Sequence, residues 1–94
     1  MRHVYDYFMD AGHGWVKVPI NELVQLGIAH KISDYSYIYK KNAYLEEDCD
    51  ATLWAKAKGD NNFRTRARYS ENSRIRSYVH YDYQVHVVPL LGEH

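Results

Sequence analysis

The stretch Tyr35–Glu46, YSYIYKKNAYLE, decides the fold that the sequence predicts. Residues 35–39 are rich in aromatic and β-branched side chains, a composition typical of strands. Residues 40–43 supply a polar turn, and residues 44–46 resume the strand pattern. We expect Asp50 to cap a helix that runs from Ala51 and stops at Gly59. The stretch and its continuation therefore predict a unit of strand, turn, strand and helix.

An earlier segment of the chain has the same pattern. Residues 4–8 and 15–18 favour strands around a glycine-containing turn at 11–14, and Pro19 ends the second strand. A short helix is expected over residues 21–26, with Gly27 as its left-handed cap. Trp15 aligns with Tyr44, and Asn21 with Asp50, at one constant offset. The strand–turn–strand–helix unit is therefore predicted to occur twice.

A third hairpin is predicted without a helix. Its strands are residues 63–69 and 74 to about 88, with a polar turn between them. Keeping the apolar side chains on one face sets Ala67 opposite Ile75 and Arg66 opposite Arg76. The predicted fold is α+β: one antiparallel sheet of about six strands with two short helices on one face, in the order ββα-ββα-ββ. Residues 1–94 are expected to form a single domain.

Composition narrows the class of protein. The 94 residues include one cysteine, so no internal disulfide can form, which is typical of a reducing cytoplasm. No apolar stretch approaches the roughly 20 residues of a membrane span. Twelve lysines and arginines balance twelve aspartates and glutamates. A net charge of zero is unusual for nucleic-acid binders, which carry excess positive charge. We expect a cytoplasmic protein with no membrane partner.

Arginines alternate along the third predicted hairpin and therefore share one strand face. Guanidinium groups opposite one another repel, so an anionic partner would stabilise this arrangement. The alternative is a solvated face whose arginines pair with acids of the chain itself. Nearby tyrosines could stack on a partner's rings or bases. The predicted contact surface comprises Arg64, Arg66, Arg68, Arg74, Arg76, Tyr78, Tyr37 and Tyr39.

An acidic segment is the second candidate site. It contains Glu46, Glu47, Asp48 and Asp50. Carboxylates at a helix N-terminus are favoured by unpaired N–H groups and the helix dipole, so capping explains them. The alternative is contact with a partner's basic surface, or imitation of nucleic-acid phosphates. Cys49 within the segment is expected to be a buried structural thiol, because neighbouring carboxylates oppose thiolate formation.

No motif indicates catalysis. The six histidines lack zinc-site spacing, so neither a metal nor another cofactor is predicted. An enzymatic function would need a pocket that brings His13 or His80 to a nucleophile. Ten tyrosines exceed what a small core can bury, and exposed tyrosine with arginine is typical of binding interfaces. A non-catalytic binding protein is therefore favoured over an enzyme.

Several segments resemble small, mostly uncharacterised accessory proteins of bacteriophages and plasmids. These segments are DAGHGWVKVP at 10–19, LGI at 26–28, KIS at 31–33, YSY at 35–37, YLEEDCD at 44–50 and, more loosely, SRIRSY at 73–78. The resemblance implies a protein that acts in a bacterial host cell. Short single-domain proteins of mobile elements often bind host machinery, including as inhibitors of CRISPR or restriction systems.

Two partner classes follow from these observations. The first is a host protein or ribonucleoprotein complex of a defence system, bound through the arginine and tyrosine surface. The second is RNA or DNA bound by that same surface, which a steep salt dependence would reveal. The sequence leaves open whether the protein is a monomer or a homodimer, and what the tail from Pro89 onward does.

Overall fold

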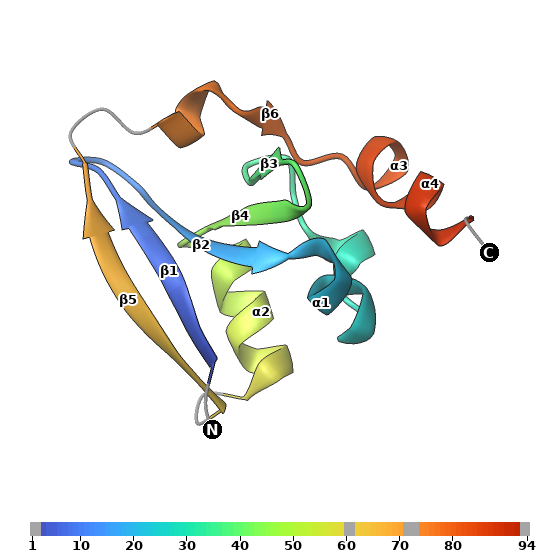
Figure 1. The fold of residues 1–94 in the computed structure, drawn as a ribbon, viewed down its shortest axis with the longest axis horizontal. Coiled ribbons are helices and arrows are strands. Elements are labelled where there is room, and N and C mark those ends of the chain that lie inside the picture. Colours follow the sequence, from blue (N-terminus) through green and yellow to red (C-terminus); the bar gives the residue numbers. More distant parts are fainter. Residues whose placement is uncertain (1–2, 60–61, 71–73, 93–94) are drawn as a thin grey trace.

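The computed structural model describes residues 3–59, 62–70 and 74–92. The fold is α+β, with one open mixed sheet of six strands in the order β5-β1-β2-β4-β3-β6 and short helices around it (Figure 1). The elements are β1 (His3–Met9), β2 (Gly14–Pro19), α1 (Ile20–Gln25), η1 (Ala29–Lys31), β3 (Tyr37–Tyr39), β4 (Asn42–Glu46), α2 (Asp50–Lys58), β5 (Phe63–Tyr69), η3 (Arg74–Ser77), β6 (Val79–His80), α3 (Tyr83–His86) and α4 (Val88–Leu91).

The two strand–turn–strand–helix units are present. β1 and β2 form an antiparallel hairpin followed by α1, and β3 and β4 form a second hairpin followed by α2. Helix α1 ends where Gly27 has a φ of 74°. The N–H groups of Gly27 and Ile28 there donate to the carbonyls of Val24 and Leu23, which satisfies the last turn. Antiparallel pairing of β2 with β4 joins the two units.

The predicted third hairpin is wrong. β5 runs parallel to β1 at one edge of the sheet, whereas the two-residue β6 pairs with β3 at the other. The parallel register sets Arg66 opposite Asp6, so opposite charges replace the predicted pair of arginines. It also brings the ring of Phe63 to 4.4 Å from that of Trp54. Favourable charge pairing and aromatic packing explain why β5 joins β1.

Residues 74 to about 88 do not form the long strand that the alternation of polar and apolar side chains predicted. Residues 74–77 form the 3₁₀ turn η3, and residues 83–86 and 88–91 form α3 and α4. Asp82 caps α3, because its carboxylate accepts hydrogen bonds from the N–H groups of Gln84 and Val85. This cap starts a helix within the stretch that was predicted to continue as a strand.

The sheet packs on both sides, and the two sides differ. On one side α1 and α2 supply Leu23 and Trp54 to the main core with Val16, Val18 and Leu45, which confirms that both helices cover one face. On the other side η3 places Ile75 against Trp15 and Tyr44. We call this second side the Trp15 face. Because side chains alternate along strands, Asp6 and Phe8 of β1 lie on it as well.

Candidate functional site

The predicted arginine cluster is divided between two elements. Arg64, Arg66 and Arg68 lie on β5 and share the side of the sheet that bears Asp6. Arg74 and Arg76 lie on η3 instead of on a paired strand, so the predicted pairing of Arg66 with Arg76 is wrong. Arg76 still reaches the Trp15 face, because it lies 5.6 Å from the ring of Trp15.

Acids of the chain itself neutralise much of this positive charge. Asp6 Oδ1 lies 2.9 Å from Arg66 Nη2 and 3.1 Å from Arg68 Nε. Burial alone would raise the pKa of Asp6, but hydrogen bonds from Arg68 and Arg66 outweigh it and lower that pKa. Asp6 is shared by the two arginines and therefore offsets part of the repulsion that called for an anionic partner.

Arg76 joins the β1–β2 turn to the Trp15 face. Its Nε and Nη2 donate to the two carboxylate oxygens of Asp10 at 2.6 and 3.0 Å, and Nη2 lies 2.8 Å from His13 Nδ1. The hydrogen bonds from Arg76 hold the pKa of Asp10 well below its usual range. The same bonds raise the pKa of Arg76. This pair fixes η3 over the sheet.

The Asp10→Asn variant tests that pair through acid stability. A carboxyl group with a lowered folded-state pKa stabilises the protein above its unfolded pKa of about 4 and loses this contribution as the pH falls toward its folded pKa. The wild type is therefore expected to lose more stability than the variant between about pH 5 and pH 2. Urea denaturation across this range measures both proteins. A difference in stability that stays constant with pH would exclude a role for Asp10 ionisation.

The tyrosines lie in two aromatic groups. Tyr39 and Tyr78 stack with ring centroids 4.5 Å apart, and Tyr78 also contacts Tyr44 at 5.1 Å. Tyr37 lies between Trp15 and His80, with ring distances of 6.2 and 4.7 Å. Of the three tyrosines that the sequence singled out as contact residues, the structure brings Tyr39 and Tyr78 into contact and packs Tyr37 and Tyr78 against the same cluster of buried residues.

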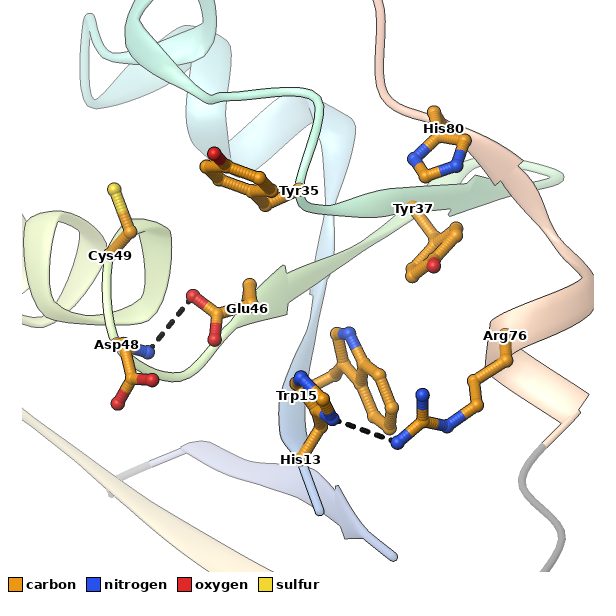
Figure 2. A pocket seen from close by; sticks show the side chains of 9 residues that line it. All are labelled: His13, Trp15, Tyr35, Tyr37, Glu46, Asp48, Cys49, Arg76 and His80. Atoms are coloured by element: carbon orange, nitrogen blue, oxygen red, sulfur yellow. Dashed lines mark hydrogen bonds between the residues drawn. The ribbon is translucent and has the colours of Figure 1, made fainter.

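A pocket of about 400 Å³ opens beside these rings (Figure 2). Aromatic side chains form most of its wall, with two carboxylates on one side and Arg76 on the other. The pocket is lined by His13, Trp15, Tyr35, Tyr37, Glu46, Asp48, Cys49, Arg76 and His80. Of these residues, Trp15 and Tyr35 were not among the site residues predicted from the sequence.

The acidic segment is divided by the fold. Asp50 is buried and begins α2, and no side-chain cap is present, so the predicted N-cap at Asp50 is wrong. Glu47 lies away from the pocket and accepts a hydrogen bond from the Tyr7 hydroxyl at 2.5 Å. Burial and this bond raise the pKa of Tyr7. Glu46 and Asp48 line the pocket, where Glu46 accepts a hydrogen bond from the N–H of Asp48 at 3.0 Å.

Cys49 is exposed, so the prediction of a buried thiol is wrong. The negative charge of Asp50 is the main factor that raises the pKa of Cys49, as the neighbouring carboxylates led us to expect. In Figure 2 the Cys49 sulfur points away from His13 and His80, although all three line the pocket. This arrangement does not activate the thiol as a nucleophile.

Comparison with known proteins adds no functional assignment. No protein-family model matches the chain, and searches of curated proteins and solved structures found no similarity. Among the described residues, no three histidine, cysteine or acidic side chains gather as a metal site. The helices in this same part of the chain are too short or too polar to cross a bilayer. The Trp15 face and its pocket are therefore the candidate functional site.

Proposed function

We propose that this protein is a non-catalytic binding protein whose Trp15 face docks on a protein partner. The observation that carries the proposal is the pocket, in which exposed aromatic rings stand between carboxylates and an arginine. Tyr35 and Tyr39 are 69% and 45% exposed, so large rings are presented to solvent. Exposed tyrosines beside a preformed pocket are typical of the anchor regions of protein interfaces.

The charge pattern favours a protein over a nucleic acid. Phosphates would be repelled by Glu46 and Asp48 at the pocket. Asp6 offsets part of the positive charge of Arg66 and Arg68, and Asp10 offsets that of Arg76. A protein surface offers both signs of charge and apolar side chains, which suits a site that contains acids, an arginine and aromatic rings.

The resemblance to accessory proteins of phages and plasmids suggests the biological setting. In this proposal the partner is a host protein or ribonucleoprotein complex of a CRISPR or restriction system, and docking inhibits it. The acids near the pocket would then take the place of nucleic-acid phosphates on a basic surface of the complex. The protein would inhibit the complex by covering this basic surface, which needs neither a cofactor nor a reacting group.

Exposed tyrosines provide a matched test of the docking face. Replacement of Tyr35 and Tyr39 by serine is expected to weaken partner binding about 30-fold, because buried tyrosine anchors contribute about 2 kcal/mol or more. The control is Tyr69→Ser: Tyr69 is 62% exposed, but it alternates with Arg68 and so lies on the opposite side of β5. Immobilised variants are exposed to nuclease-treated bacterial lysate, and retained proteins are identified and quantified.

The assay distinguishes the possible outcomes. Loss of a retained complex with the Tyr35 and Tyr39 replacements, but not with Tyr69→Ser, supports the proposal. The same variants should lose the ability to protect an incoming phage or plasmid in cells that carry the captured defence system. Equal retention by all variants would contradict the docking face.

A second candidate, binding of RNA or DNA, rests on the stacked pair of Tyr39 and Tyr78. Lys40 lies 5.4 Å from the ring of Tyr39, so this corner offers a stacking surface with a nearby cation. Nucleic-acid binding predicts retention that nuclease abolishes and affinity that falls steeply with salt. No gel shift at low salt would exclude this candidate.

A further inference from the structure

Aromatic rings surround the pocket on three sides. Figure 2 shows Tyr35 above the opening, Trp15 below it and Tyr37 at the side opposite Glu46. The rings come from β2, from the loop before β3 and from β3 itself, so strand pairing holds two of the three. Faces of tryptophan and tyrosine rings attract cations, most strongly where water is excluded.

The uncompensated charge of the pocket is negative. Arg76 is neutralised through its two hydrogen bonds to Asp10, which lies outside the lining. Glu46 is 9% exposed, and its carboxylate accepts a hydrogen bond from an uncharged donor, the N–H of Asp48. Within the described ranges, neither Glu46 nor Asp48 forms an ion pair with a lysine or arginine. A nearly buried carboxylate without a cation is costly, and a ligand that supplies one would stabilise it.

A buried hydrogen-bond donor in the same wall also lacks a partner. Trp15 is 2% exposed, and its indole Nε1 is buried and makes no hydrogen bond. Among the described residues, no other buried side-chain nitrogen or oxygen lacks a hydrogen-bond partner. Trp15 and Glu46 are directly paired across β2 and β4, so their side chains are neighbours on the Trp15 face. In Figure 2 the nitrogen of the indole is directed toward the space between Glu46 and Tyr37. A buried donor without an acceptor and an unpaired carboxylate therefore lie side by side in this wall.

We infer that the pocket binds an arginine side chain of the protein partner, with Glu46 as its counter-ion and the indole of Trp15 as the wall beside that carboxylate. A guanidinium group is planar, stacks on aromatic rings and donates to carboxylates in a fixed geometry. It would neutralise the charge of Glu46 and could stack on the rings of Tyr35 and Tyr37, whereas the Trp15 ring already has Arg76 beside it. This inference deepens the proposed function and rests on it, because the arginine belongs to the docking partner.

The test uses two blocked amino acids that differ in charge and share their shape. N-acetyl-arginine methylamide is titrated into the full-length ¹⁵N-labelled protein, with N-acetyl-citrulline methylamide as the neutral analogue. The indole N–H signal of Trp15 reports binding, and Trp15→Phe assigns it apart from Trp54. We expect the arginine compound to shift this signal and to bind at least about tenfold tighter than the citrulline compound, because charge-assisted hydrogen bonds are the stronger ones.

Two isosteric variants locate the charge. Glu46→Gln keeps an oxygen that can accept from the N–H of Asp48, so the fold is retained while the counter-ion is lost. It is expected to weaken binding of the arginine compound about tenfold or more. Glu47→Gln is the matched control, since Glu47 points to Tyr7 and does not line the pocket. Affinity that is unchanged by Glu46→Gln, or reduced equally by Glu47→Gln, overturns the inference.

Further arms identify the source of the cation and separate this inference from the proposed function. Equal binding of the citrulline compound, or no binding at about 20 mM of the arginine compound, overturns the arginine site. Guanidinium chloride that binds as tightly as the arginine compound, with the same indole shift, would indicate a free small cation and would also overturn it. Loss of host-protein capture with the tyrosine replacements tests docking on its own, so either claim can fail while the other holds.

Discussion

The Trp54→Ala variant is expected to lose 3–5 kcal/mol of stability, roughly the cost of removing a large buried aromatic side chain. Trp54 is 2% exposed and packs its ring 4.9 Å from Tyr5 and 4.4 Å from Phe63. Its indole nitrogen donates to Glu22 at 2.7 Å. One residue thus connects α2 to α1, β1 and β5. A domain of this size has a total stability of about 5–10 kcal/mol, so the variant should be partly unfolded at 37 °C.

Urea denaturation of Trp54→Ala measures this loss. The control is Thr52→Ala, a truncation of an exposed residue in the same helix, which should change stability by about 0.5 kcal/mol or less. β5 should be affected most, because Phe63 would lose its packing partner at that edge. A loss below about 1.5 kcal/mol for Trp54→Ala would show that Trp54 does not hold these elements together.

The second large effect is expected for Asp50→Ala. Asp50 is 1% exposed, and its carboxylate accepts hydrogen bonds from the N–H and hydroxyl of Ser33 and from the hydroxyl of Ser36. The Ser36 oxygen in turn accepts from the N–H of Glu46 at 2.9 Å. Removal of the carboxylate leaves several buried donors without an acceptor, each of which costs about 1–3 kcal/mol. A total loss of about 3 kcal/mol is expected.

Asp50→Asn is the control for Asp50→Ala, because it keeps the shape and one acceptor oxygen. It should lie between the wild type and the alanine variant in urea denaturation. The Ser33–Ser36–Asp50 network lies directly beside Tyr35 and Glu46, so Asp50→Ala should also shift the indole N–H signal of Trp15 in the absence of any ligand. Wild-type stability together with an unchanged signal would mean that the network does not shape the pocket.

The first half of the fold could be predicted because its signals are local. Strand alternation, Pro19 and the glycines at 27 and 59 mark element ends within a few residues. The alternation of arginines along β5 is also local, but it is equally compatible with a hairpin and with a parallel edge strand. Asp6, the residue that decides between them, lies 60 positions from Arg66.

The candidate site shows the same limit. Tyr37, Tyr39 and Tyr78 could be selected from composition and spacing; Tyr39 and Tyr78 stack on each other, whereas Tyr37 contacts Trp15 and His80. The pocket could not be predicted, because it depends on the pairing of β2 with β4, which places Trp15 beside Glu46. No turn connects these two strands, so the sequence carries no local signal of their pairing. The polar cluster that buries Asp50 likewise uses Ser33 and Ser36, which precede β3. From the sequence, the role of Asp50 as the acceptor in this cluster could not be distinguished from helix capping.

The parallel pairing of β1 with β5 has a consequence for the order of assembly. The β1–β2 and β3–β4 hairpins bring together residues close in sequence, so they can form early. The β1–β5 pair closes a loop of about sixty residues, which makes it the entropically costly step. During synthesis β1 is complete long before Arg66 leaves the ribosome, and its edge stays open in that interval. Asp6, a charge on that open edge, disfavours premature pairing with another chain until β5 arrives.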